Sequence, residues 1–222
     1  NVGFNYGSLA VIEKLDLRVQ RDELLVCVGP SGCGKSTLLS LLGGHLTPTA
    51  GKITRNGQSR TIYQDGGLLP WLTVRQNIAL GTGGKMKKVD EWLEITRLTD
   101  FASSFAHQLS GGMRQRVELA RALAAETDIL LMDEPFSALD YQTRRRMRKE
   151  LVSTLAERPR SVVFVTHDIE EAVQIGDRVV VLGTRPASVR KELTLPAGRS
   201  RAPAAPGVAE AEQTIMEELG LS

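Results

Sequence analysis

The sequence has little that would suit a secreted or membrane-spanning protein. Its 222 residues include only two cysteines, Cys27 and Cys33, too few for a disulfide framework or a four-thiolate zinc site. No apolar run approaches the roughly 20 residues of a transmembrane helix, and residues 1–6 have neither the basic nor the apolar stretch of a signal peptide. We therefore expect a reduced, cytosolic chain with two free thiols and no targeting segment.

Excess charge of one sign and aromatic side chains are also scarce. The 28 basic and 26 acidic residues leave a net charge of +2, too weak an imbalance to indicate nucleic acid or an anionic membrane as the main partner. Aromatic residues make up only 5% of the chain. Because 41% of the residues are nevertheless hydrophobic, the chain has enough apolar material for one domain with a sizeable core.

Short apolar runs alternate with helical patterns along the chain. Buried parallel strands are expected over 24–28, 129–132 and 162–165. Helices are expected over 36–42, 113–125 and 141–157. Strands that alternate with helices predict an α/β fold with a mostly parallel sheet.

Two further strand patterns lie in the first third of the chain. Leu15, Leu17 and Val19 alternate with polar residues, which predicts a half-buried strand. Asn56-Gly57 is a strong turn signal and predicts a hairpin between 52–55 and 60–63.

The segment 66–112 has a different texture and predicts a small helical lobe. Its two helices are expected over 74–80 and 89–98, joined by a flexible glycine-rich stretch at 81–84. Near the C-terminus, the Pro-, Ala- and Gly-rich residues 196–207 have the composition of a linker that leads to a short final helix.

A glycine-rich loop between a predicted strand and a predicted helix fits the pattern G-x-x-x-x-G-K-[ST]. Its glycines allow backbone N–H groups to point at phosphate oxygens, at the positive end of a helix dipole. Lys35 supplies a charge for the β- and γ-phosphates, and the Ser36 hydroxyl is a Mg²⁺ ligand. The predicted nucleotide site comprises Gly29, Pro30, Ser31, Gly32, Cys33, Gly34, Lys35, Ser36 and Thr37.

An acidic pair follows the predicted strand at 129–132. Asp133, at the end of this strand, is suited to the Mg²⁺ shell. Glu134 is then placed to polarise a water molecule for in-line attack on the γ-phosphate. A polar strand end is common, but its combination with the phosphate loop favours a catalytic role.

A third motif, Leu109-Ser110-Gly111-Gly112, precedes the predicted helix at 113–125. Together with the phosphate loop and the acidic pair, it resembles the signature of the ATP-binding-cassette ATPases. The resemblance implies a RecA-like phosphate-loop core at 1–65 and 113–195 with an N-terminal antiparallel β subdomain. It also assigns 66–112 to a helical lobe that carries the signature, and 196–222 to a linker and C-terminal helix.

In the family that this chain resembles, two copies sandwich two ATP molecules head to tail. Each nucleotide then lies between the phosphate loop of one subunit and Ser110, Gly111 and Gly112 of the other. These residues begin a helix, so their free N–H groups can face the γ-phosphate. ATP would hold the dimer closed because only there does the γ-phosphate touch both halves.

Four single residues also match the family in order and spacing. Tyr6 is expected to stack on adenine, and Gln64 to join the Mg²⁺ shell and act in catalysis. His167 would contact the γ-phosphate and hold the attacking water, and Asp140 would line the subunit interface. Without the other motifs, the alternatives are an exposed surface aromatic at Tyr6 and a structural residue at His167, and a histidine after a strand is more often structural. The spacing of both residues from the other motifs favours stacking and catalysis.

Two stretches, 68–78 and 165–182, resemble the ATPases of nitrate, sulfonate and taurine importers. This resemblance implies peripheral attachment to the cytoplasmic face of the cell membrane. The implied partners are a second copy of the chain, integral membrane permease subunits and, indirectly, a solute-binding protein. The alternatives left open are an exporter-type subunit and a regulator that dimerises on ATP without hydrolysing it.

Overall fold

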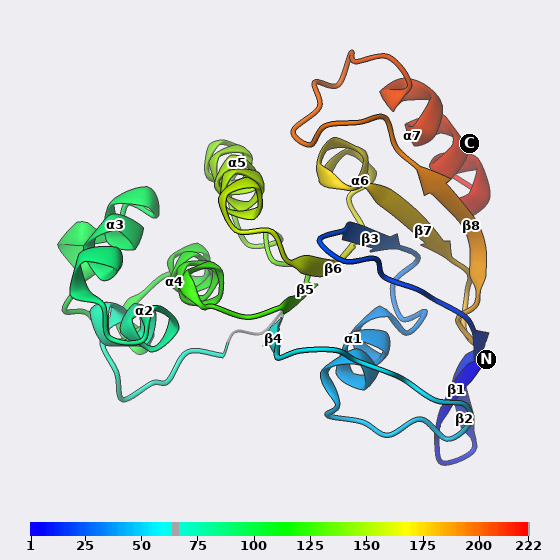
Figure 1. Cartoon of the computed structure of the whole chain (residues 1–222), viewed down its shortest axis with the longest axis horizontal. Coiled ribbons are helices and arrows are strands. Elements are labelled where there is room, and N and C mark those ends of the chain that lie inside the picture. The colour runs from blue at the N-terminus through cyan, green and yellow to red at the C-terminus, as the bar shows by residue number, and fades with distance from the viewer. Residues whose placement is uncertain (64–66, 222) are drawn as a thin grey trace. The chain divides into compact units, whose positions relative to one another are not determined.

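The computed structural model describes residues 1–63 and 67–221, so Gln64 lies outside the described residues. The chain divides into two compact units. Unit 1 comprises residues 1–61, 129–134 and 160–222, and unit 2 comprises residues 62–128 and 135–159. Figure 1 labels the elements of both.

A six-stranded sheet forms the centre of unit 1, in the order β4-β5-β6-β3-β7-β8. The strands are β3 (Leu24–Val28), β4 (Ser59–Ile62), β5 (Ile129–Asp133), β6 (Ser161–Thr166), β7 (Arg178–Leu182) and β8 (Val189–Thr194). The pairs β3–β6, β3–β7 and β5–β6 are parallel, whereas β7–β8 is antiparallel. The expected α/β fold with a mostly parallel sheet is therefore confirmed.

Helices cover both faces of this sheet (Figure 1). One face carries α1 (Lys35–Gly43), and the other carries α6 (Ile169–Ile175) and α7 (Val208–Leu219). Because both faces are covered, all five residues of β3 are buried.

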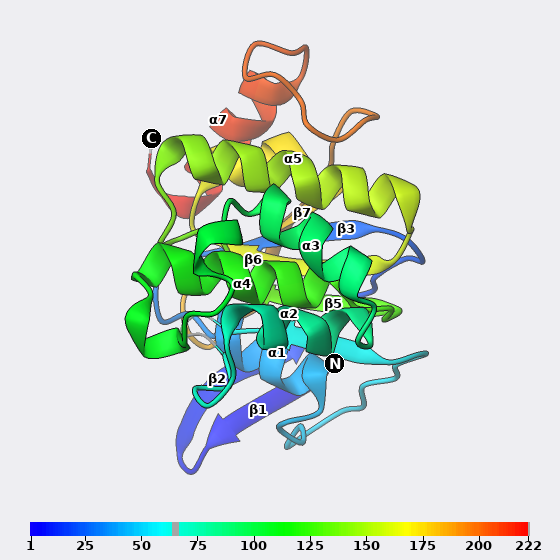
Figure 2. The ribbon, with the colours of Figure 1, turned by 90° about the vertical axis from the view of Figure 1, so that its left-hand side faces the viewer.

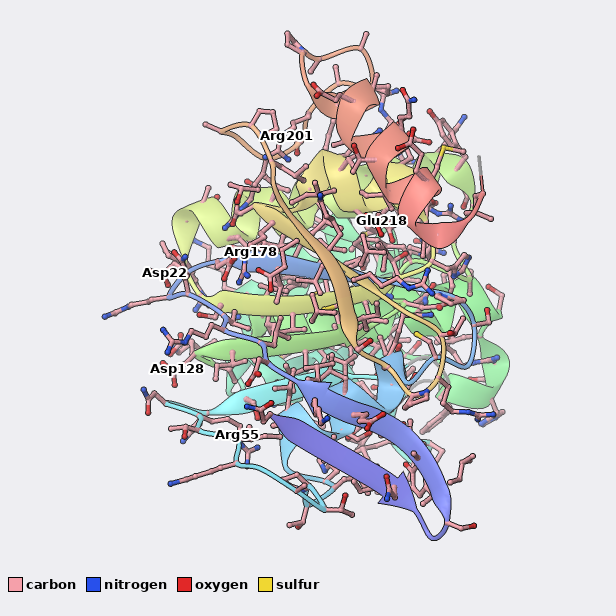
Figure 3. The ribbon with its side chains drawn as sticks, turned by 90° about the vertical axis from the view of Figure 1, so that its right-hand side faces the viewer. Asp22, Arg55, Asp128, Arg178, Arg201 and Glu218 are labelled. Carbon is pink, nitrogen blue, oxygen red and sulfur yellow. The ribbon has the colours of Figure 1, made fainter. Side chains whose placement is uncertain are left out.

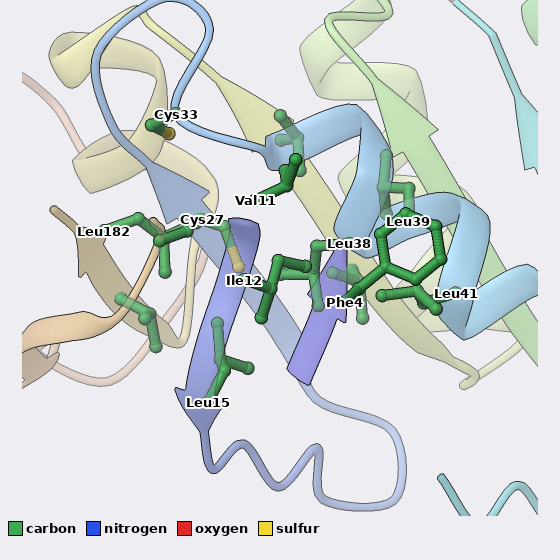
Figure 4. Packing of buried hydrophobic residues seen from close by; sticks show 14 of the residues in the cluster. Phe4, Val11, Ile12, Leu15, Cys27, Cys33, Leu38, Leu39, Leu41 and Leu182 are labelled. Atoms are coloured by element: carbon green, nitrogen blue, oxygen red, sulfur yellow. The ribbon is translucent and has the colours of Figure 1, made fainter. Parts of the chain in front are cut away.

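An antiparallel pair, β1 (Val2–Tyr6) and β2 (Leu9–Leu15), forms the second sheet of unit 1. Side chains from both strands join the core cluster with α1 and β3, as Figure 4 shows. The labelled members of this cluster are Phe4, Val11, Ile12, Leu15, Cys27, Cys33, Leu38, Leu39, Leu41 and Leu182. The N-terminal antiparallel subdomain is thus confirmed.

The two weaker strand predictions are wrong. Leu15 ends β2, but residues 16–20 form no strand; Leu17 and Val19 are partly buried against the core, which gives the same alternation. The segment 52–55 is also not a strand, so no hairpin forms at Asn56-Gly57. Instead, β4 lies next to β5, and the Ile129 N–H donates to the Gln58 carbonyl at 3.1 Å.

Two arginine side chains of the C-terminal segment bind other parts of unit 1, and Figure 3 labels one of them, Arg201. Arg201 donates to the carbonyls of Val173 at 3.1 Å and Gly176 at 2.8 Å, at the carboxyl end of α6. Arg199 lies 2.6 Å from the Asp177 carboxylate. The segment that composition describes as a linker is therefore held in place by charge-assisted hydrogen bonds.

Unit 2 is helical (Figure 2). It contains α2 (Val74–Thr82), α3 (Met86–Ile95), α4 (Gly111–Ala124) and α5 (Tyr141–Glu157), with short 3₁₀ turns at Thr99–Phe101 and Ala106–Gln108. Within the described ranges, none of the helices is both long enough and apolar enough to cross a membrane.

Gly81 in unit 2 is required for close packing and does not provide a flexible link. Gly81 was expected in the flexible stretch 81–84, but it is buried inside α2. A Cβ atom at Gly81 would lie 2.0 Å from the Arg121 carbonyl oxygen of α4. The absence of a side chain therefore allows the backbones of α2 and α4 to approach closely.

We predict that Gly81→Ala destabilises the protein by roughly 1–3 kcal/mol or more, because α2 must move away from α4. Helix propensity alone predicts the opposite sign, a gain of about 1 kcal/mol. Thermal unfolding compares the variant with Leu80→Ala, which truncates an exposed side chain of the same helix. A higher Tm for Gly81→Ala would contradict the close packing.

Candidate functional site

Parallel pairing brings three strand ends of unit 1 to the same edge of the sheet. Val28, the last residue of β3, pairs with Thr166 at the end of β6. Asp133, the last residue of β5, pairs with Val165. The phosphate loop, the acidic pair and His167 all follow directly from these ends, and the carboxyl edge of an α/β sheet is where ligands bind.

The backbone of the phosphate loop depends on glycine at two positions. Gly34 has a φ of +120°, and a Cβ atom there would lie 3.0 Å from Val11 Cγ1 and 3.2 Å from the Val11 carbonyl oxygen. Gly29 has no room either, because its Cβ would lie 3.1 Å from the Leu182 carbonyl oxygen. The loop is therefore pressed between β2 and β7 and cannot accept larger residues at these points.

Helix α1 begins without a side-chain cap, as α3 and α7 also do. Thr73, Ser110, Asp140 and Asp168 each cap a helix with a side-chain oxygen. At α1 the N-cap is Gly34, which has no side chain to accept a hydrogen bond from the first turn. These N–H groups, together with the helix dipole, suit a bound anion such as phosphate.

Lys35 is buried beneath this loop. Its Nζ donates to the carbonyls of Gly29 at 2.8 Å and Pro30 at 3.1 Å, which uses two of its three donors. The charge is thus held at the centre of the loop, where a phosphate would lie.

The Cys33 side chain is 2% exposed. Burial raises the pKa of its thiol, although the nearby Lys35 charge lowers it. This burial leaves the Cys33 thiol poorly accessible to reagents.

A carboxylate and an imidazole form a close pair at the sheet edge. Glu134 Oε2 lies 3.0 Å from His167 Nδ1, with the glutamate side chain 15% and the histidine side chain 63% exposed. The Glu134 N–H donates to the Val165 carbonyl at 2.9 Å, and its φ of +45° is in the left-handed region. Such backbone strain in a residue other than glycine costs about 1–3 kcal/mol and is concentrated at functional sites.

Two further residues of unit 1, Asp133 and Ser36, carry oxygen atoms that could bind a metal ion. Asp133 is 6% exposed, and the Ser36 hydroxyl lies in the exposed first turn of α1. A carboxylate and a hydroxyl are hard oxygen ligands of the kind that Mg²⁺ prefers, completed by water and phosphate. No group of three or more His, Cys, Asp and Glu residues in the described ranges would hold a metal by itself.

Tyr6 ends β1 with 52% of its surface exposed, and its ring meets Phe4 edge-on at 4.8 Å. It pairs with Leu9 of β2, the strand whose Val11 contacts Gly34.

Unit 2 holds the signature residues. Ser110 Oγ accepts from the Met113 N–H at 3.2 Å and so caps α4. Gly112 is required by packing, since its Cβ atom would lie 3.0 Å from the Ala138 carbonyl oxygen. Gln115, a residue that the sequence reasoning missed, accepts from the Ala138 N–H at 3.0 Å and connects the signature to the next segment. No local sequence signal distinguished Gln115, because its burial is visible only in the folded chain.

Asp140 has a structural role that its place in the motif did not indicate. Its Oδ1 accepts from the Thr143 N–H at 3.0 Å and caps α5. Hydrogen bonds from Thr143 lower the pKa of Asp140. The structure therefore brings Lys35, Asp133, Glu134 and His167 to one edge of unit 1, whereas Ser110, Gly112 and Asp140 lie in unit 2.

Comparisons with known proteins agree with these observations. A family model described as ABC transporter matches residues 12–137. The chain is 39% identical over 207 residues to the taurine import ATP-binding protein TauB of Roseobacter denitrificans, covering 86% of this chain and 77% of that protein. It is also 39% identical over 209 residues to the aliphatic sulfonates import ATP-binding protein SsuB of Bacillus cereus, covering 88% and 83%.

A solved structure has the same fold. It is a dimeric ATP-binding cassette in a post-hydrolysis state, bound to ADP and Pi. Its TM-score is 0.79 at 30% identity, and the match covers 89% of this chain and 98% of that one. The expected phosphate-loop fold is therefore confirmed.

The burial of Cys27 and Cys33 predicts how fast their thiols are alkylated. Because it raises the pKa of Cys33, and that of Cys27 to about 12, we expect slow alkylation at a pH below the ordinary thiol value of about 8.5. The rate should rise as the pH increases past that value, and Cys33 should react first, since Cys27 is the more deeply buried.

Peptide mapping after N-ethylmaleimide treatment measures both rates, with Cys33→Ser and urea-unfolded protein as controls. Rapid labelling of the folded chain at neutral pH would mean that the loop opens.

Proposed function

Since the chain belongs to the ABC transporter family of ATPases, we propose that it is the motor subunit of an importer for a small sulfonate-type anion. The edge of unit 1 supports this proposal most directly, because it combines a phosphate loop, a buried lysine and a Glu134–His167 pair at 3.0 Å. The relatives at 39% identity are named for taurine and aliphatic sulfonate import, which favours uptake over export.

We propose the following roles at the nucleotide. The uncapped first turn of α1 and the loop N–H groups bind the β- and γ-phosphates, and Lys35 neutralises their charge. Tyr6 stacks on the adenine. Ser36, Asp133 and Gln64 hold Mg²⁺, which when bound would draw charge from the phosphate oxygens.

Glu134 is the proposed general base. Its carboxylate accepts a proton from the attacking water, and the contact with His167 Nδ1 at 3.0 Å fixes the orientation of that carboxylate. His167 is exposed enough to contact the γ-phosphate with its other ring nitrogen. Loss of the γ-phosphate then removes the interaction that His167 makes.

The proposed active form is a head-to-tail dimer. In it, Ser110, Gly111 and Gly112 of one subunit meet the ATP held by the phosphate loop of the other. The start of α4 suits this role, because its N–H groups and dipole attract negative charge. ATP binds two subunits at once and ADP does not, so hydrolysis would change the affinity between subunits.

We also propose a permease partner at the cytoplasmic face of the membrane. Unit 2 carries several exposed large apolar side chains: Tyr63, Trp71, Leu80, Met86, Phe101 and Phe105. Trp71 is 69% exposed at the turn before α2. Exposed aromatic residues on a domain of this size are typical of protein contacts.

The first test is Glu134→Gln. Without the general base, turnover should fall by roughly 10²–10⁴-fold while ATP binding is retained. Phosphate release from Mg-ATP and light scattering would be followed together, and an ATP-dependent dimer should accumulate in the variant. Full turnover in this variant would remove Glu134 from the mechanism, and a persistent monomer at high protein concentration would argue against the dimer.

Lys35→Ala should act on binding instead of on the chemical step. Loss of a buried, charged donor should weaken ATP binding by roughly 10- to 100-fold. Fluorescence titration with a labelled nucleotide would measure the affinity, with Lys52→Ala, a substitution of an exposed lysine outside the loop, as the control. Unchanged affinity would exclude Lys35 from the phosphate site.

A further inference from the structure

The helix that follows His167 is too short to be stable by itself. Helix α6 spans seven residues, about two turns, and isolated helices shorter than about 12 residues are marginal in water. His167 lies between Thr166, the last residue of β6, and Asp168, the N-cap of α6. The direction in which the His167 ring leaves the backbone therefore depends on what holds α6 in place.

The first turn of α6 is stabilised by residues of the same segment. Asp168 Oδ1 accepts from the Glu171 N–H at 3.0 Å, and the Asp168 N–H donates to Thr166 Oγ1 at 3.0 Å. Glu170 and Glu171 add negative charge, which suits the positive end of the helix dipole. The turn that carries His167 is thus bound to β6 on one side and to α6 on the other.

The last turn of α6 has no stabilising residue of its own. It contains no basic side chain, although its carbonyls form the negative end of the dipole. Arg201, labelled in Figure 3 and 25 residues beyond Gly176, supplies both the charge and the donors. Its Nη1 donates to the carbonyls of Val173 at 3.1 Å and Gly176 at 2.8 Å, and its backbone N–H donates to the Gln174 carbonyl at 3.0 Å. Arg201 therefore caps the carboxyl end of α6.

Helix α7 packs on α6, and both helices belong to unit 1. Burial and the nearby charges of Glu170 and Asp168 raise the pKa of Glu212 on α7, so this helix reaches the first turn of α6. Arg201 Nε also donates to the Pro196 carbonyl at 2.9 Å, which fixes the path of the chain between β8 and α7. The C-terminal segment thus contacts α6 at both of its ends.

We infer that Arg201 is a positioning residue for His167 and acts on it through α6. Without Arg201, the last-turn carbonyls of α6 lose their donors and the helix end frays. The His167 ring then takes a wider range of directions and makes its 3.0 Å contact with Glu134 for less of the time. The inference rests on the proposed function, in which His167 contacts the γ-phosphate, although Arg201 lies at the end of α6 that is farther from His167.

The test compares Arg201→Ala with Arg190→Ala. Both substitutions remove an arginine that caps a helix, because Arg190 Nη1 donates to the carbonyl of Glu218 in the last turn of α7 at 2.9 Å. Since α7 is not adjacent in sequence to a proposed site residue, Arg190→Ala controls for a loss of stability alone. Arg201→Lys keeps the charge but loses the fork of donors, and it carries the comparison if Arg201→Ala does not fold.

The His167 ring is measured first, by NMR of the imidazole groups, because this requires neither nucleotide nor turnover. The chain has only three histidines, so His167→Ala assigns the signal. In Arg201→Ala we expect the His167 signal to move toward its position in urea-unfolded protein, while those of His45 and His107 stay unchanged. Arg201→Lys should give a smaller movement, and Arg190→Ala should leave all three signals as in the wild type.

Hydrolysis of ATP should then show a changed kcat and an unchanged nucleotide affinity. In Arg201→Ala we expect kcat to fall by up to about 100-fold, the effect of misplacing a reacting group by about 1 Å. ATP affinity should remain that of the wild type, because the phosphate loop and Lys35 lie outside α6. Arg190→Ala should keep the wild-type kcat.

Two results would overturn the inference. One is a His167 signal that does not move in folded Arg201→Ala or Arg201→Lys. The other is an equal movement in Arg190→Ala, because a general loosening of unit 1 would then explain it. A moved signal with an unchanged kcat would instead support the positioning by Arg201 and remove His167 from the proposed mechanism, so the two failures can be told apart.

Discussion

The parallel pairing of β3, β5 and β6 is the constraint on which the site depends. Parallel strands in register end together, so three loops distant in sequence begin at one edge. The hydrogen bond from the Glu134 N–H to the Val165 carbonyl continues this pairing one residue beyond β5. A shift of β5 by one residue would turn Asp133 to the other face of the sheet and separate Glu134 from His167.

Helix beginnings are used in two different ways in this chain. At α1 the N-cap is a glycine with no capping side chain, so the first-turn N–H groups are suited to the phosphate that we propose there. At α4 and α5 they are capped by Ser110 and Asp140, residues that the resemblance places at the subunit interface. Ser110 and Asp140 therefore each stabilise the helix that they cap, and each also lies where the resemblance places the partner subunit. Evolutionary or engineered changes there would alter stability and assembly together.

Much of this architecture could be predicted from local sequence. The helix expected over 141–157 has those bounds, and the phosphate loop lies between a buried strand and a helix, as its pattern requires. Such signals are local: an apolar run, a cap or a glycine at a fixed spacing. The residues at the edge of unit 1 could be named because each follows an apolar strand.

The failures share a different cause, which is dependence on distant partners. Leu17 and Val19 alternate like a strand, but partial burial against the core produces the same pattern. Asn56-Gly57 is a good turn with no partner strand, because β4 pairs with β5 instead. Gly81 carries a local signal of flexibility, but close packing of α2 against α4 buries it. No local window contains that information.

The left-handed backbone at Glu134 limits how this protein can be stabilised against heat. Glycine would relieve the strain at this position, and so would be preferred by any selection for thermal stability alone. The chain instead has a glutamate here, and its backbone strain lowers the free energy of unfolding by about 1–3 kcal/mol. Stabilising the protein without loss of chemistry therefore requires changes elsewhere, and variants found by heat challenge should be checked at this residue first.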